Sequence, residues 1–125
     1  MEGYKVTIVE SSRELSGKEK IMFKDFDNMI QLDQAVTEGD GILVNVSDYV
    51  IANVHNEKSD NKDYTKYILV AEDGQMYITG SEPFWNQFMG IYTDMKGEEE
   101  EWSLKIYKRE SKNYKGKSFL TCTIV

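Results

Sequence analysis

The stretch that decides the fold is 64–95, YTKYILVAEDGQMYITGSEPFWNQFMGIYTDM. Its first half contains two runs rich in β-branched and aromatic residues, with Asp73-Gly74 between them. An Asp-Gly pair in this position favours a hairpin, because both central turn residues adopt positive φ. In its second half the apolar residues recur every three or four positions, which is typical of one helical face. The stretch therefore predicts strands at 64–71 and 75–80 and a helix at 81–95.

The ends of the helix carry their own signals. Ser81 suits the N-cap, Pro83 is tolerated in a first turn, and Gly97 is a stop signal. The predicted buried face consists of Phe84, Phe88, Ile91, Tyr92 and Met95.

Further strands are predicted on both sides of this stretch. Residues 42–54 form one long strand with a bend at Ser47-Asp48, and 101–109 and 118–125 form two more. The resulting order from residue 41 is β-β-β-α-β-β, which is the order of an OB-fold barrel. We therefore expect a mostly β protein with an OB-like five-stranded barrel.

The chain of 125 residues predicts a single domain, 1–125, whose barrel core is 41–125. Residues 1–40 are expected to form an N-terminal extension. Within it the sequence predicts strands at 3–10 and 18–25 and a short helix at 28–36.

Composition narrows the class of protein. The net charge is −7, and the one cysteine, Cys122, allows no intramolecular disulfide. No signal peptide or membrane span is evident, so we expect a cytoplasmic protein, in the host cytoplasm if a phage encodes it. His55 is the only histidine, and no His/Cys set suits zinc. We therefore expect no cofactor, no metal and no enzymatic activity.

Positive charge is concentrated near the end of the chain. Residues 105–117 contain six Lys/Arg, one acid and two tyrosines, a net +5 that leaves −12 for the other residues. An acidic protein does not adhere broadly to nucleic acid. Any nucleic-acid site must therefore be a local patch, and this segment is the strongest candidate.

Strand alternation places these side chains on one surface. Lys105, Tyr107 and Arg109 share one face of their strand, and Phe119 lies with Thr121 and Thr123 on the next. The opposite faces, predicted to be core, hold Trp102, Leu104 and Ile106 on one strand and Leu120, Cys122 and Ile124 on the other.

The predicted hairpin extends this surface if its loop has two residues. Val70 would then lie opposite Tyr77, and Tyr64, Lys66 and Tyr77 would share a face. Rings and cations on one sheet surface are what a sequence-tolerant single-strand binder needs, although exposed strand aromatics are more often cross-strand packing partners.

The second half of the chain resembles the small single-stranded-DNA-binding proteins of phages of Gram-positive bacteria. The matching segments are 72-EDGQMYITGS-81, the helix, and 103-SLKIYKRESKNYKGKSFLTCTIV-125. The loop Ser111-Lys112-x-x-Lys115-Gly116-x-x-Phe119 carries much of the resemblance. It implies an OB-like fold, with Tyr77 and Lys105–Lys117 in a groove that coats single-stranded DNA during replication.

Two functions remain open. The first is a non-catalytic single-stranded-DNA-binding protein of a phage or mobile element. Copies of such a protein can also associate with one another along the DNA. The second is a protein-interaction module or DNA mimic that inhibits a host nucleic-acid enzyme, for example as an anti-CRISPR, through Glu98, Glu99, Glu100 and Glu101. The candidate DNA-binding residues are Tyr49, Tyr64, Lys66, Tyr77, Lys105, Tyr107, Arg109, Lys112, Tyr114, Lys115, Lys117 and Phe119.

Overall fold

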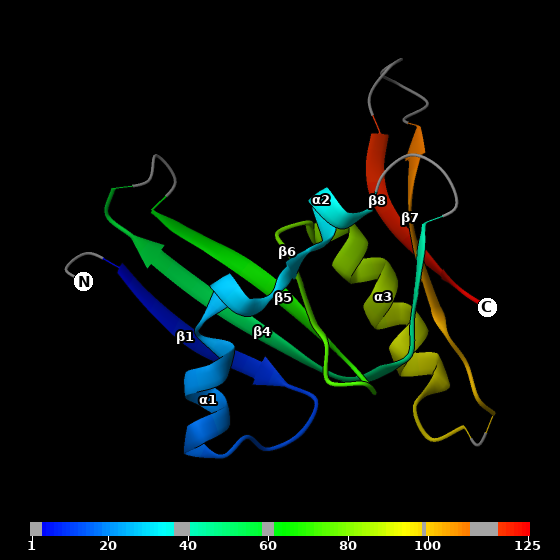
Figure 1. Ribbon diagram of the computed structural model, residues 1–125, viewed down its shortest axis with the longest axis horizontal. Coiled ribbons are helices and arrows are strands. Elements are labelled where there is room, and N and C mark those ends of the chain that lie inside the picture. The colour runs from blue at the N-terminus through cyan, green and yellow to red at the C-terminus, as the bar shows by residue number, and fades with distance from the viewer. Residues whose placement is uncertain (1–3, 37–40, 59–61, 99, 111–117) are drawn as a thin grey trace. The chain divides into compact units, whose positions relative to one another are not determined.

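The computed structural model describes residues 4–36, 41–58, 62–98, 100–110 and 118–125 (Figure 1). They form a mostly β protein with two sheets, which confirms the expected class. Over these residues no strand pair closes the sheets into a barrel. The chain divides into two compact units, and each unit combines segments that are far apart in sequence. The first unit is Met1–Gln31 with Ser47–Gly80, and the second is Leu32–Val46 with Ser81–Val125.

The first unit is built on a five-stranded sheet. Its order is β1-β4-β5-β6-β2, with β1 antiparallel to β4, β5 antiparallel to β6, and β2 parallel to β6. The helix α1 (Gly17–Phe23) lies beside this sheet, and its Phe23 packs in a core with Val50, Ile68 and Ile78 (Figure 1). The strands are β1 (Tyr4–Ser11), β2 (Ile30–Gln31), β4 (Val46–Asn56), β5 (Asp63–Ala71) and β6 (Met76–Thr79).

The predicted hairpin exists, but its loop has three residues instead of two. The Ala71 N–H donates to the Gln75 carbonyl at 2.9 Å, and the Gly74 N–H donates to the Ala71 carbonyl at 2.9 Å. Gly74 adopts φ +90°, the left-handed conformation that ends such a loop. Val70 therefore lies opposite Met76, and the predicted pairing with Tyr77 is wrong by one residue.

The strand predicted at 18–25 is wrong, because a capping box starts a helix there. The Ser16 hydroxyl accepts from the Glu19 N–H, and the Glu19 carboxylate accepts from the Ser16 N–H. Arg13 bonds to both Glu19 and Asp48, and its hydrogen bonds hold the pKa of Glu19 at about 2. The helix predicted at 28–36 is replaced by a 3-10 turn η1 (Phe26–Asn28), by β2, and by the short helix α2 (Leu32–Ala35).

The second unit holds a three-stranded antiparallel sheet of order β3-β7-β8, which packs against α3 (Figure 1). The predicted helix is confirmed as α3 (Glu82–Met95). The Ser81 hydroxyl accepts from the Phe84 N–H, and Phe84, Trp85 and Phe88 are buried. The strands are β3 (Ile42–Val44), β7 (Leu104–Glu110) and β8 (Ser118–Ile124).

The single strand predicted over 42–54 is wrong, because the chain changes sheet at Asn45. β3 ends at Val44 and pairs with β7, whereas β4 begins at Val46 and belongs to the five-stranded sheet. The Ser103 hydroxyl donates to the Asn45 side-chain oxygen at this break. Asp48, where a bend was predicted, accepts instead from Ser12 and Arg13.

Gly41 generates a prediction about the packing of β7. It adopts φ +76°, and a Cβ there would lie 2.3 Å from the Ile106 carbonyl oxygen and 2.9 Å from the Tyr107 Cβ. We expect Gly41→Ala to lower the free energy of unfolding by about 1–3 kcal/mol, measured by urea denaturation. Gly90→Ala is the matched control, because Gly90 lies exposed in α3 with nothing within 4 Å of the added Cβ. It should raise that free energy by about 0.5–1 kcal/mol. An equal effect of the two substitutions would contradict the close contact.

A second prediction concerns His55, which lies between two carboxylates at one end of the five-stranded sheet. Its Nδ1 is 2.9 Å from Asp63 Oδ1, and its Nε2 is 2.6 Å from Glu57 Oε1. These hydrogen bonds raise the pKa of His55, with Asp63 contributing most.

A histidine whose pKa is higher in the folded than in the unfolded state stabilises the fold at pH values below its unfolded-state pKa. This stabilisation is lost as the pH rises through its folded-state pKa. His55→Gln should therefore destabilise the protein more at about pH 6 than at about pH 9, as measured by urea denaturation at each pH. If His55→Gln lowered the free energy of unfolding by the same amount at both pH values, the stabilisation by His55 would not depend on the imidazolium charge.

Candidate nucleic-acid interface

The two faces of the β3-β7-β8 sheet differ sharply, as strand alternation predicted. Leu104, Ile106, Leu120 and Cys122 are buried on one face, and burial raises the pKa of the Cys122 thiol to about 12. Trp102 is half-buried and Ile124 is 42% exposed, so neither is as buried as predicted. The opposite face, here called the basic-aromatic face, carries Leu43, Lys105, Tyr107, Arg109, Phe119, Thr121 and Thr123.

The register orders these side chains into rows across the three strands. Arg109 lies opposite Phe119, Tyr107 lies opposite Thr121, and Lys105 has Leu43 on one side and Thr123 on the other. The Lys105 ammonium is 5.8 Å from the centroid of the Tyr107 ring, within cation–π distance. Phe119 is 43% exposed and Leu43 is 64% exposed. The face therefore combines two cations with accessible apolar and aromatic surface.

The lysines and arginine of β7 serve different purposes. In the part of the chain that the structure describes, neither Lys105 nor Arg109 forms an ion pair with a carboxylate. Lys108, which has the opposite parity, donates from Nζ to the Asp33 carbonyl oxygen at 2.8 Å and so connects β7 to α2. Alternation thus separates a structural lysine from two cations that can contact an anionic ligand.

The one-residue shift in the register of the β5–β6 hairpin places its predicted DNA-binding residues on two different faces of the sheet. Tyr64 and Lys66 lie on the α1 side of the five-stranded sheet, where Tyr64 packs beside Val54 and its ring centroid is 5.8 Å from the Lys66 ammonium. Tyr77 points to the opposite side, paired with Leu69. The prediction that Tyr64, Lys66 and Tyr77 share a face is therefore wrong.

Tyr77 has a different aromatic neighbour, which sequence reasoning missed. Tyr67 lies opposite Thr79, two residues from the Leu69–Tyr77 pair, so the two half-buried rings are diagonal neighbours on one face. Burial, followed by the nearby Asp73 charge, raises the pKa of Tyr77. No signal in the sequence could have revealed this neighbour, because it depends on the length of the turn, which the Asp-Gly pair does not specify.

The remaining candidates fall outside the basic-aromatic face. Tyr49 is only 8% exposed, and its hydroxyl donates to Glu10 Oε2 at 3.1 Å, so its ring is not available for stacking. Glu98, Glu100 and Glu101 are exposed. Outside the described residues lie Lys112, Tyr114, Lys115, Lys117 and Glu99.

Within the described ranges, no three His, Cys, Asp or Glu side chains are grouped to hold a metal ion. No helix among these residues has the length and apolarity needed to cross a membrane. The chain matches no family model, no curated protein and no solved structure.

Proposed function

We propose that the protein binds single-stranded DNA without catalysis, through the basic-aromatic face of the β3-β7-β8 sheet. The observation that carries the proposal is the Lys105–Tyr107 pair, with Arg109 and Phe119 paired beside it on the same face. Cations contact phosphates, and rings stack on any base, so this combination favours sequence-tolerant binding. The setting we propose is the replication of phage or mobile-element DNA in the cytoplasm.

The spacing along β7 supports a single strand over a duplex. Lys105, Tyr107 and Arg109 are successive residues of one strand face and therefore lie about 7 Å apart. Stacked bases in a duplex are separated by about 3.4 Å per strand. A row of contacts twice as widely spaced suits an extended strand whose bases are unstacked from one another.

An OB-like architecture is part of the same proposal. The segment 42–56 contributes strands to both sheets, and it is followed by the two strands β5 and β6, then α3, then β7 and β8. In OB folds the face of strands 2–3 and the loops between strands 1–2 and 4–5 bind oligonucleotides, and in this order β7 and β8 are the fourth and fifth strands, which flank the last of these loops.

The proposed DNA site can be tested by comparing two lysines that each lie near a tyrosine ring. Lys105 and Lys66 both have a tyrosine ring centroid at 5.8 Å, but only Lys105 belongs to the basic-aromatic face. Binding of a poly-dT oligonucleotide, followed by protein fluorescence over a range of salt concentrations, should weaken in Lys105→Gln. The slope of log K against log salt should also fall by about 0.7. Lys66→Gln should retain the wild-type slope.

A second substitution tests stacking on the same face. We expect Tyr107→Ala to weaken oligonucleotide binding by about 1–3 kcal/mol with the salt slope unchanged, because a ring contributes stacking and no charge. Its urea denaturation curve establishes that the variant is folded. Wild-type affinity in both Lys105→Gln and Tyr107→Ala would exclude this face as the DNA site.

A second candidate function is supported by the overall charge. The chain carries −7, and Glu98, Glu100 and Glu101 are exposed, as in a protein that presents carboxylates where phosphates would bind. Such an inhibitor of a host nucleic-acid enzyme should not bind poly-dT even at low salt. It should instead compete with DNA for a basic nuclease, in an assay with purified enzyme.

A further inference from the structure

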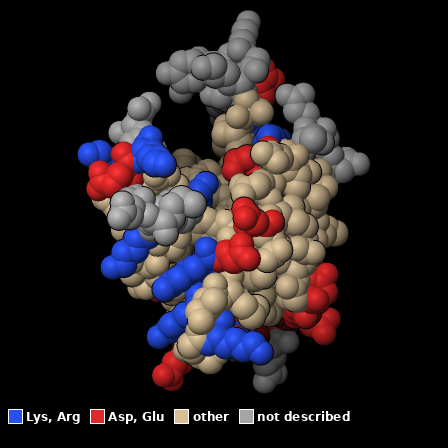
Figure 2. Space-filling view, turned by 60° about the vertical axis from the view of Figure 1, so that its left-hand side comes forward, with Lys and Arg blue, Asp and Glu red and all other residues tan. Residues whose placement is uncertain are grey.

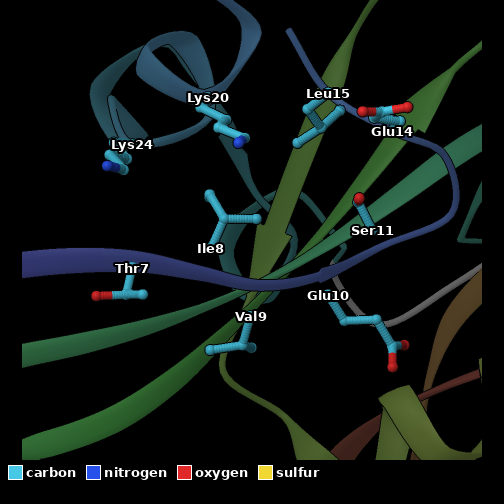
Figure 3. A pocket seen from close by; sticks show the side chains of 9 residues that line it. All are labelled: Thr7, Ile8, Val9, Glu10, Ser11, Glu14, Leu15, Lys20 and Lys24. Carbon is cyan, nitrogen blue, oxygen red and sulfur yellow. The ribbon is translucent and has the colours of Figure 1, made fainter. Parts of the chain in front are cut away.

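A groove lies between the strand β1 and the helix α1 in the first unit (Figure 3). One wall is formed by five consecutive residues of β1, Thr7–Ser11. Lys20 of α1 and Lys24, the C-cap of that helix, form the other wall, and Ile8 points toward them whereas Glu10 points away. The groove therefore has apolar surface beside two exposed ammonium groups.

The β1 wall of this groove is a sheet edge. In the described part of the chain, no strand pairs with the outer side of β1. Its pairing with β4 is irregular between Ile8 and Glu10, and Val9 there is 57% exposed. An unpaired edge presents backbone N–H and C=O groups that can add an extended segment as a further strand.

The charge of the groove selects among such segments. Lys20 and Lys24 are both exposed, and Figure 2, which turns this side forward, shows Lys and Arg gathered on its lower part. Glu14 also lines the groove and carries a negative charge, but the Glu10 side chain points away from the lysines, which leaves two lysines against one glutamate. An acidic extended segment is the complementary occupant.

We propose that the β1–α1 groove binds the acidic segment around Glu100 and Glu101 of a second copy of this chain. These glutamates are exposed and belong to neither a helix nor a strand, so they can adopt an extended pairing. The groove and the acidic segment are different surfaces of the chain, so the proposed contact between two copies is heterologous. Such a head-to-tail contact repeats along a row of molecules.

The test is sedimentation velocity of the full chain without DNA, over a range of protein and salt concentrations. Wild-type protein should self-associate, and the association should weaken with added salt. We expect the double variant Lys20→Glu/Lys24→Glu to weaken the association constant by about tenfold or more. Lys18→Glu/Lys58→Glu is the control, since it changes the net charge equally while both residues lie outside the groove.

A charge exchange makes the test specific. Glu100→Lys/Glu101→Lys alone should show the same weakening of self-association, because its basic segment meets a basic groove. Mixed with Lys20→Glu/Lys24→Glu, it should associate again, because each copy then offers a complementary partner to the other. Absence of wild-type association, or a mixture that stays monomeric, would overturn the proposal. Oligonucleotide titration of the same variants reports the DNA site separately, so failure of one proposal leaves the other measurable.

Discussion

The register of the β5–β6 hairpin is the constraint on which the core of the first unit depends. The three-residue loop ending at Gly74 pairs Ile68 with Ile78, and both are fully buried beside Phe23 of α1. A shift of one residue would turn each side chain of β6 to the opposite face and replace Ile78 with Tyr77. Burial of one isoleucine stabilises the fold by about 1.5–3 kcal/mol, so the register is held by the core as well as by the turn.

A second constraint acts where the chain leaves β3. Because the strand breaks at Asn45, the segment 42–56 pairs with β7 before the break and with β1 after it. Gly41 lies against the backbone of Ile106 just before β3, a contact that any side chain at this position would prevent. The arrangement of Lys105 and Tyr107 beside Leu43 thus depends on backbone features that precede β3, far from β7 in sequence.

Strong local periodicity explains which elements were predictable. The helix α3 has a cap at Ser81 and a clear apolar face, and β7 alternates strictly between Leu104 and Ile106 on one side and Lys105 and Tyr107 on the other. For α1 the apolar run at 21–23 suggested a strand, although the Ser16 to Glu19 capping box was present in the sequence. Local sequence does not reveal the length of a turn, because Asp73-Gly74 fits two loop lengths.

Tyr49 was wrongly predicted to be available for DNA binding, because its burial depends on β1, a partner distant in the chain.

The charge of the protein determines what the basic-aromatic face must do under the proposed function. A chain with a net charge of −7 repels a polyanion at distances up to about 10 Å, the screening length at about 0.1 M ionic strength. Approach to the face is therefore opposed, and short-range contacts must supply the affinity. Lys105 and Arg109 offset the repulsion locally, whereas Tyr107 and Phe119 contribute contacts that salt does not weaken. Under the proposed function, the rings and cations of this strand face form the local patch through which an acidic protein binds an anionic ligand, whereas Lys108 of the same strand contacts α2.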